Sequence, residues 1–393
     1  MKFPFFKLKR ESASPGQVCP EETRTDFSID PIWLGVTLTL VIFGICMVYS
    51  ASSQLAARKY HNSFYFAQKQ MAFAFFGFLA MIAFRFIPYQ KLQKKIFWIL
   101  GISLVTLILV LIPGIGSKMN GASRWFRLGG ISIQPAEFSK LIVVIFLAFS
   151  MTRHRDQMKD FKRGFLYHIG FVGAFILLVL LEPDLGMAIT LALITGVMLF
   201  VGGVRMKHLF LSIIPMIPLA YLLVWRVPYR RMRVLSYLDP WKDPLGSGFH
   251  LKHSFLAFGS GGWGGMGLGG SQQKLFYLPE PHTDFIFSIV GEELGFVGVL
   301  IIAVLFMVLI IKCLKLALRV KDLFGLYLVV GITVMIGFQA FINMLVVMGL
   351  LPTKGLTLPF LSYGGSSLLL NMICVGILMN LTAQHHRVKG CVS

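Results

Sequence analysis

The sequence has few charged residues and few cysteines, and each scarcity excludes a common class of protein. Only 14% of the 393 residues are charged and 56% are hydrophobic, whereas a soluble domain carries about 25% charged residues. The cysteine count is five, an odd number, and Cys46, Cys313 and Cys374 fall in or beside apolar segments, so a disulfide framework is not expected. With a mean hydropathy of +0.75, the chain is predicted to be an integral membrane protein.

Acidic residues are also scarce, with 17 Asp and Glu against 37 Lys and Arg, for a net charge of +20. In a soluble protein this excess would indicate nucleic acid, but in a membrane protein the basic residues must first be sorted by membrane side. With the N-terminus inside, 22 fall in cytoplasmic segments and 14 outside, or 7 outside without the long segment 226–283. We therefore predict no nucleic-acid partner. Residues 1–30 and 387–393 are expected to be cytoplasmic tails, and residues 1–30 show no pattern of a cleaved signal peptide.

Apolar stretches between polar clusters define the expected fold. A membrane-spanning helix needs about 20 mostly apolar residues, and stretches of about this length recur throughout residues 31–386. The predicted fold class is an all-α polytopic membrane protein of about ten transmembrane helices, with a large extracytoplasmic loop between helices seven and eight. The predicted spans are 31–50, 69–88, 96–113, 136–152, 165–182, 186–204, 207–225, 284–312, 323–350 and 364–384.

The segment 226–283 is the longest outer connection and is where we expect the working surface, because long structured loops are usually functional. It is basic at its start, glycine-rich at 258–270, and ends in Tyr-Leu-Pro-Glu-Pro-His-Thr-Asp-Phe at 277–285. The glycine-rich stretch contains a formal G-x-G-x-x-G, but the strand, helix and acidic residue of a dinucleotide site are missing. We interpret these glycines as permitting close backbone packing.

Asp284 lies where this polar loop becomes a long apolar helix. Near the positive helix N-terminus its carboxylate is expected to be ionised and accessible to a substrate, with helix capping as the alternative. Ser288, Gly291, Gly295 and Gly298 form a stripe of small residues below it, where a helix packs or a groove opens. Glu292 and Glu293 lie deeper, as functional carboxylates or as packing devices.

Lys140 is the one basic residue that falls inside a predicted span. It lies three residues after Glu137, near a helix start marked by Pro135, so the two side chains face the same way. A plain interfacial ion pair is one interpretation, and an ammonium that binds a substrate phosphate is the other. Because an unpaired ammonium in a membrane is costly, we predict that Lys140 and Asp284 face one cavity with Glu137 close by.

Four arginines and a carboxylate pair mark further candidate sites on the outer side. The arginines suit bidentate phosphate recognition, with ordinary lipid headgroup contact as the alternative. At another outer turn, Glu182 and Asp184 either bind a cation or cap a helix. His250, His253 and His282 lack the spacing of a zinc site, so no metal centre is predicted. The four arginines are Arg226, Arg230, Arg231 and Arg233.

Six motifs in order resemble the shape, elongation, division and sporulation family, whose members are FtsW, RodA and SpoVE. The similarity runs from about Asp30 to Arg387, and the fifth and sixth motifs resemble the division branch, FtsW, most closely. One departure is His250 and His253, in a stretch where glutamines are usual. The motifs are V-Y-S-A-S (48–52), N-G-A-S-R-W-F-R-L-G (120–129), Q-P-A-E-F-S-K (134–140), Y-L-P-E-P-H-T-D-F-I-F (277–287), G-E-E-L-G (291–295) and T-K-G-L-T-L-P-F-L-S-Y-G-G-S-S (353–367).

The resemblance implies a peptidoglycan glycosyltransferase that polymerises lipid II into β-1,4-linked strands by an inverting transfer, with Asp284 as the essential catalytic residue. A lipid II flippase is the alternative function; no internal repeat typical of transporters is visible. The implied location is the bacterial inner membrane at the division septum. The implied partners are lipid II, a class B penicillin-binding protein (an FtsI-like transpeptidase) and other divisome proteins; no cofactor is certain, and a divalent cation stays open. The expected substrate-binding residues are Lys140, Glu137, Arg124, Arg230, Arg231, Arg233 and His282.

Overall fold

The computed structural model describes residues 30–119, 122–129, 131–242, 248–274, 281–353 and 355–390. Residues 1–29 and 391–393 of the expected tails therefore lie outside the described residues, whereas residues 387–390 of the expected C-terminal tail are helical. Asp30, the last residue of the expected N-terminal tail, caps the first helix by accepting a hydrogen bond from the Ile32 N–H at 3.1 Å. At the other end the last helix continues to Gly390.

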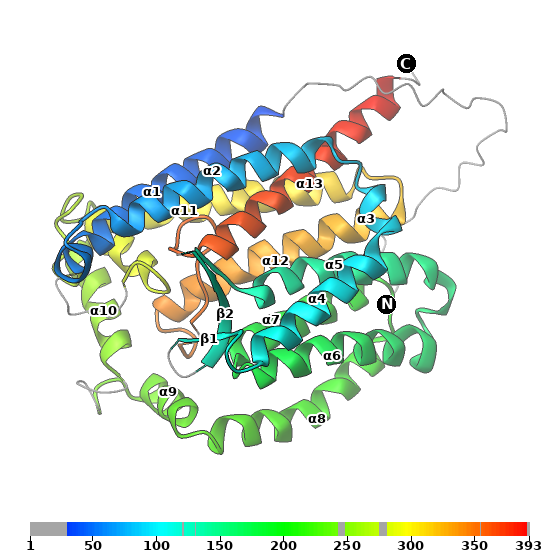
Figure 1. The fold of residues 1–393 in the computed structure, drawn as a ribbon, viewed down its shortest axis with the longest axis horizontal. Coiled ribbons are helices and arrows are strands. Elements are labelled where there is room, and N and C mark those ends of the chain that lie inside the picture. The colour runs from blue at the N-terminus through cyan, green and yellow to red at the C-terminus, as the bar shows by residue number, and fades with distance from the viewer. Residues whose placement is uncertain are drawn as a thin grey trace.

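The described residues form a helical bundle of the predicted class (Figure 1). Eight of their helices are long and apolar enough to cross a membrane, and two shorter apolar helices accompany them. The fold class is confirmed. The eight are α1 (Pro31–Tyr60), α2 (Tyr65–Phe86), α5 (Pro135–Arg153), α6 (Tyr167–Leu181) together with the π-helical turn Phe161–Leu166 that precedes it, α8 (Met206–Trp225), α11 (Ile286–Ala317), α12 (Leu323–Val347) and α13 (Gly365–Gly390), and the two are α4 (Ile96–Leu111) and α7 (Leu185–Val201).

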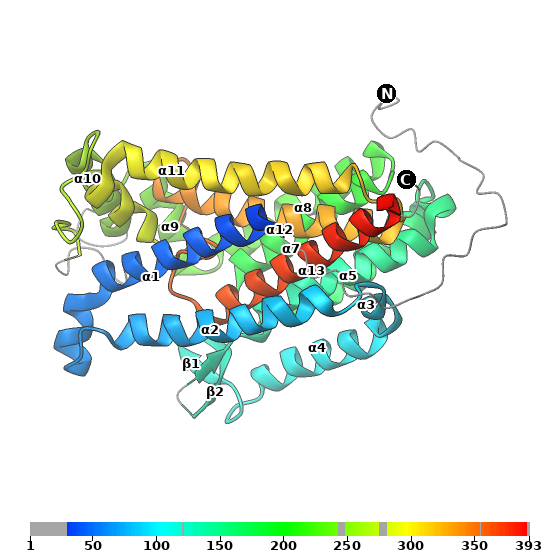
Figure 2. The ribbon, with the colours of Figure 1, turned by 90° about the horizontal axis from the view of Figure 1, so that it is seen from above.

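Helices α5, α12 and α13 form the centre of the bundle, and α8 lies at its edge (Figures 1 and 2). In the most apolar 18-residue stretch of α13, 89% of the residues are buried, whereas none are buried in the corresponding stretch of α8. In a bilayer, apolar side chains gain nothing from leaving lipid, so helix contacts depend on close packing and polar pairs. The central helices are thus the ones suited to carry polar groups.

Most helix boundaries differ from the prediction by a few residues, and the end of α1 differs most. Helix α1 continues ten residues past the predicted end at residue 50, because residues 51–60 contain neither glycine nor proline. It stops at His61, whose backbone is left-handed with φ of 53°. Helix α11 begins at Ile286 and is interrupted at Gly295, where φ is 63° and ψ is −159°.

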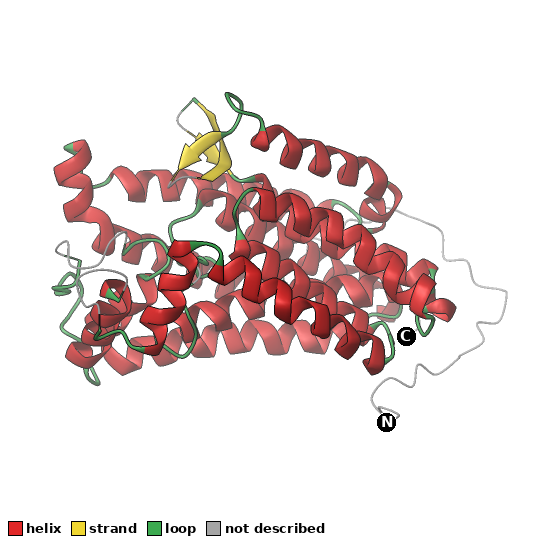
Figure 3. Cartoon of the chain, turned by 90° about the horizontal axis from the view of Figure 1, so that it is seen from below, coloured by secondary structure: helices red, strands yellow, loops and turns green. Residues whose placement is uncertain are grey.

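A small antiparallel sheet of order β1-β2-β3 was not predicted (Figure 3). Its strands are β1 (Ser117–Met119), β2 (Ala122–Leu128) and β3 (Ile131–Ile133). The Asn-Gly and Gly-Gly pairs between them are typical of two-residue hairpin turns. Hydropathy does not detect such short strands.

The long segment 226–283 contains helices α9 (Pro228–Leu238) and α10 (Phe249–Gly261). Helix α10 packs against α11 at the end of the bundle where α11 begins (Figures 1 and 2). Ser254 of α10 contacts Ser288 of α11, with 2.7 Å between the hydroxyl oxygens, and donates to the Val347 carbonyl at 2.6 Å. Ser288 of the small-residue stripe on α11 therefore packs against α10, whereas Gly291 and Gly295 of the stripe line a groove of about 410 Å³. A packed helix and an open groove are both present along the stripe. The other short helix, α3 (Gln90–Lys94), precedes α4.

Candidate active site at the start of helix α11

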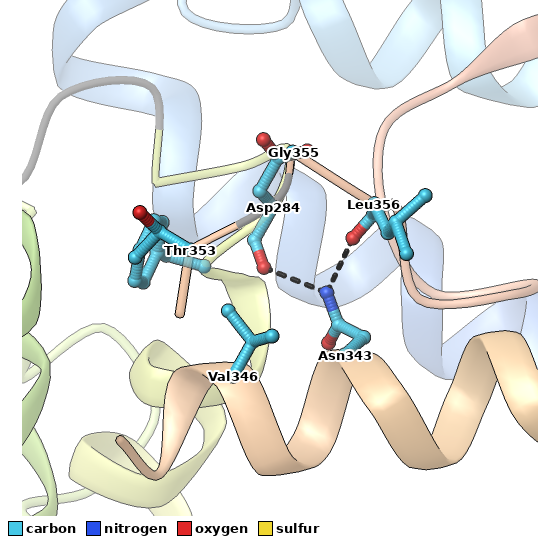
Figure 4. A pocket seen from close by; sticks show the side chains of 7 residues that line it. Asp284, Asn343, Val346, Thr353, Gly355 and Leu356 are labelled. Carbon is cyan, nitrogen blue, oxygen red and sulfur yellow. Dashed lines mark hydrogen bonds between the residues drawn. The ribbon is translucent and has the colours of Figure 1, made fainter. Parts of the chain in front are cut away.

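Asp284 lies two residues before α11 begins, at the edge of a small pocket (Figure 4). Its side chain is partly exposed, and its backbone carbonyl accepts a hydrogen bond from Asn343 Nδ2 of α12 at 2.9 Å. A carboxylate at a pocket edge is suited to accept a proton from a bound hydroxyl. The pocket is lined by Asp284, Phe285, Asn343, Val346, Thr353, Gly355 and Leu356.

The loop after α12 is held against Asp284 by two polar residues of that helix. Asn343 Nδ2 also donates to the Leu356 carbonyl at 2.5 Å. One turn earlier, Gln339 Nε2 donates to the Thr357 carbonyl at 3.0 Å and to its hydroxyl at 3.2 Å. Gly355 has φ of 66°, and a Cβ on it would lie 3.2 Å from Asp284 Oδ2. Glycine thus suits both this conformation and the close approach to the carboxylate.

Lys140 is buried and joins α5 to the same stretch of α12. Its Nζ lies 2.8 Å from Glu137 Oε2 and donates to Gln339 Oε1 at 2.7 Å. The local ion pair expected from the i,i+3 spacing is therefore present. Gln339 and Asn343 are four residues apart, a rise of about 6 Å, so Lys140 and Asp284 contact neighbouring turns of one helix. A cavity shared by Lys140 and Asp284 stays a prediction, and these contacts are consistent with it.

His282 lies in an aromatic cluster two residues before Asp284. Its ring centroid is 4.4 Å from that of Phe66 and 5.4 Å from that of Tyr363, whose N–H donates to the His282 carbonyl at 2.8 Å. Burial lowers the pKa of His282 to about 4, so the imidazole is neutral at neutral pH. It contributes aromatic packing rather than charge, and its substrate-binding role stays a prediction.

Arg124 and Arg230 converge on the turn after α6 rather than on the pocket. Arg124 of β2 donates to the carbonyls of Glu182 at 2.8 Å and Pro183 at 2.6 Å, and its Nη1 lies 3.5 Å from Asp184 Oδ2. Arg230 of α9 donates to the Pro183 carbonyl at 3.3 Å. Because these contacts join the sheet, α9 and the turn, both arginines have a structural role here.

Arg231 and Arg233 are exposed on α9. Their guanidinium carbons lie 5.2 Å from the Trp225 ring centroid and 5.8 Å from that of Tyr229. Neither arginine lines the Asp284 pocket. Phosphate binding by the arginines stays a prediction.

The carboxylate pair at this turn divides into a cap and a buried acid. Asp184 accepts from the Met187 N–H at 3.0 Å and caps α7, as the capping interpretation predicted. Glu182 is fully buried, and neither of its carboxylate oxygens has a hydrogen-bond partner among the described residues. Burial and, to a smaller extent, the nearby Asp184 charge raise the pKa of Glu182 to about 8, although Arg124 opposes them.

The sequence reasoning missed Gln339 and Asn343, the α12 residues that connect the candidate site. Both are buried amides in an apolar span. Because polar residues inside a membrane span are functional candidates, the presence of Gln339 and Asn343 in an apolar span could have identified them from the sequence alone.

This chain is similar to known proteins over nearly its whole length. The model of the FtsW, RodA and SpoVE family, described as "Cell cycle protein", matches residues 31–387. A probable peptidoglycan glycosyltransferase FtsW of Geobacter sulfurreducens (strain DL-1 / KN400) is 45% identical over 92% of this chain and 96% of its own length. The stage V sporulation protein E of Bacillus subtilis (strain 168) is 45% identical over 90% of this chain and 97% of its own length.

Two solved structures share the fold. One, titled "Structural coordination of polymerization and crosslinking by a peptidoglycan synthase complex", has a TM-score of 0.76 and 29% identity, over 92% of this chain and 99% of that chain. The rod shape determining protein RodA of Thermus thermophilus has a TM-score of 0.67 and 27% identity, over 91% of this chain and 97% of its own. Since sequence and fold agree over nearly the whole length, the chain belongs to the FtsW, RodA and SpoVE family of cell cycle proteins.

Proposed function

We propose that this chain is a peptidoglycan glycosyltransferase that polymerises lipid II through Asp284. The observation that carries the proposal is the position of Asp284. Its carboxylate lies at the edge of a pocket also lined by Gly355 and Leu356, and its backbone carbonyl contacts α12 one helical turn from the Lys140 contact. The FtsW relatives are named as glycosyltransferases, which favours this activity over lipid II transport.

The reaction joins the 4-hydroxyl of an acceptor sugar to C1 of a donor sugar. As the O4–C1 bond forms, Asp284 takes the hydroxyl proton, and the bond from C1 to the pyrophosphate oxygen breaks. The electron pair leaves with undecaprenyl pyrophosphate, so an α-linked donor becomes a β-1,4 product. The proton transfer is general-base catalysis.

Lys140 is suited to stabilise the leaving pyrophosphate. An ammonium has three N–H donors; one donates to Gln339, and the Glu137 carboxylate forms an ion pair with the Lys140 charge. Fixed cationic donors stabilise charge that develops in the transition state. Glu137 and Gln339 would then keep the Lys140 amine in place between turnovers.

The proposed location is the inner membrane, at the division septum, with both termini cytoplasmic and the Asp284 end outside. The excess of Lys and Arg in the expected cytoplasmic loops supports this orientation. Arg231 and Arg233, exposed on α9, would then meet the headgroup and pyrophosphate region. The proposed partners are a class B penicillin-binding protein, which would supply crosslinking, and other divisome proteins; one solved relative comes from a peptidoglycan synthase complex.

The test is polymerisation by the purified protein. The chain is incubated with lipid II, with and without its class B penicillin-binding protein, and the products are separated on gels. Glycan strands and released undecaprenyl pyrophosphate are expected. Movement of labelled lipid II across vesicle membranes without any glycan product would favour transport instead.

A further inference from the structure

Helix α11 starts directly after Phe285 and is broken ten residues later, at Gly295. In an unbroken helix the Phe296 and Val297 N–H groups would donate to the carbonyls of Glu292 and Glu293. The break frees these four backbone groups. Inside a membrane protein each such group costs several kcal/mol, of the order of a lost hydrogen bond, if it stays unpaired.

The glycine-rich stretch of the long segment pairs all four groups. Phe296 N–H donates to the Gly262 carbonyl at 2.9 Å, and Val297 N–H donates to the Trp263 carbonyl at 3.2 Å. In return, the Glu292 carbonyl accepts from Met266 N–H at 2.9 Å and the Glu293 carbonyl accepts from Gly267 N–H at 3.0 Å. The long segment therefore replaces the missing hydrogen bonds of α11.

Glycine is required for this approach. Gly265 has φ of 79°, and a Cβ on it would overlap the carbonyl of Glu293. A Cβ on Gly261 would likewise overlap the carbonyl of Gly291. Of the three glycines in the G-x-G-x-x-G spacing, only Gly261 makes this close approach, because a Cβ on Gly259 or Gly264 would meet open space. The close backbone packing expected of the glycine-rich stretch is therefore present at Gly261 and Gly265, and the spacing itself does not explain it.

The Glu293 side chain adds a buried ion pair to this junction between the long segment and α11. Lys274 Nζ lies 2.9 Å from Glu293 Oε1, and the exposed fractions of the two side chains are 6% and 0%. Ser50 of α1 donates to Glu293 Oε1 at 2.6 Å, and Lys274 also donates to the Gly269 carbonyl at 2.7 Å. Burial of a charge is tolerated when it is paired and hydrogen-bonded, as here.

Glu292 binds the same segment from the neighbouring position. Its carboxylate accepts from the Ser271 hydroxyl and from the backbone N–H of Gln272 at 2.9 Å. Both intramembrane carboxylates thus have their partners within the protein. Three sequence motifs meet at this junction: residues 48–52, the glycine-rich stretch with residues 271–274, and residues 291–295.

We propose that Lys274 and Glu293 are positioning residues for Asp284. The helical piece 286–294 is about 14 Å long at 1.5 Å per residue, with Asp284 just before one end and Glu293 at the other. Lys274 and Ser50 fix the Glu293 end, while Asn343 holds the Asp284 carbonyl. Loss of the ion pair releases the piece to pivot and moves the carboxylate away from the acceptor hydroxyl.

Two variants and one control isolate this effect. Lys274→Met removes the ammonium, and Lys274→Arg keeps a cation at the same site. The control is Lys312→Met, because Lys312 lies 2.7 Å from Asp30, the N-cap of α1, and so forms another ion pair of α11, near the opposite end of that helix. Hydrogen exchange of the amides of residues 284–289 and polymerisation kinetics are measured for each full-length protein.

The exchange measurement tests positioning without any need for activity. Lys274→Met is expected to speed exchange at residues 284–289, whereas Lys274→Arg and Lys312→Met keep native protection. Native protection in Lys274→Met overturns the proposal. This result is independent of whether the chain proves to be a glycosyltransferase.

The kinetic measurement rests on the proposed function. Lys274→Met is expected to lower kcat by roughly tenfold to a hundredfold, the scale for displacement of a catalytic group by about 1 Å, with KM unchanged. Lys274→Arg restores kcat, and Lys312→Met leaves it native. An equal loss in Lys312→Met, or a rise in KM with native kcat, overturns the proposal.

If Lys274→Met does not fold, Glu293→Gln, which keeps the side-chain shape, takes its place with the same expectations. A native protein that makes no glycan refutes the proposed function, and the exchange result still decides the positioning role.

Discussion

Replacement of Asn343 by leucine removes the donor that ties Asp284 to the loop after α12. Asn343 Nδ2 serves two carbonyls, those of Asp284 at 2.9 Å and Leu356 at 2.5 Å. Leucine has a similar volume and no polar group, so the variant leaves both carbonyls without this donor. The cavity term stays small because little volume is lost.

The size of the effect follows from the cost of unpaired carbonyls. A buried carbonyl left without a partner costs roughly 1–3 kcal/mol; since both of these hydrogen bonds are only partly buried, we take the lower end, roughly 2 kcal/mol for the pair. Since about 1.4 kcal/mol corresponds to a factor of ten in rate, loss of this amount from the transition state lowers kcat about 30-fold. The loop and Asp284 are expected to separate before the bundle unfolds.

The assay compares this variant with a matched asparagine elsewhere. Asn380 of α13 also bridges two backbone groups, since it donates to the Arg85 carbonyl at 2.7 Å and accepts from Tyr89 N–H at 3.2 Å. Asn380→Leu should lower the melting temperature without a specific loss of kcat. A kcat within about threefold of native for Asn343→Leu, equivalent to only about 0.6 kcal/mol, would refute the reasoning, as would an equal loss in both variants.

Two further predictions concern buried charge. Burial raises the pKa of Glu182 from 4.5 to about 8, so its contribution to stability is complete below about pH 4.5 and is lost as pH rises through 8, by at most about 1.4 kcal/mol per pH unit. Glu182→Gln should therefore raise the melting temperature at pH 9 but not at pH 5, and an unchanged pH dependence of melting would contradict this. Lys140→Met should destabilise the protein by about 3–5 kcal/mol, because it leaves the Glu137 carboxylate buried and unpaired. Adding Glu137→Gln should restore the melting temperature but not polymerisation, and recovery of glycan synthesis would contradict the role of the cation.

The sequence predicted the parts of the fold that bilayer thickness controls. Apolar runs must be about 20 residues long to span the membrane, so the helices were found, while the sheet at 117–133 was missed because short strands carry little hydropathy signal. The ion pair of Lys140 and Glu137 could be predicted, because residues three apart share a helix face. The role of Asp184 as a helix cap could likewise be predicted from its local sequence.

Long-range partners were not predictable in this way. Glu293 pairs with Lys274, 19 residues away, and with Ser50, 243 residues away. No local periodicity relates such positions. Asn343 is a similar case, because only the folded chain shows that it faces the loop at Leu356 rather than lipid.

The measurement that tests the account most directly is glycan synthesis by the purified Asp284→Asn protein. The contact of Asp284 with Asn343 uses the backbone carbonyl, so the substitution keeps this contact while it replaces the carboxylate with an amide that cannot take a proton. The account predicts that polymerisation of lipid II falls by a factor of about 100 to 10,000, the usual contribution of a general base, while the melting temperature and lipid II binding stay native. Glycan strands made at a near-native rate by a folded Asp284→Asn protein would contradict it.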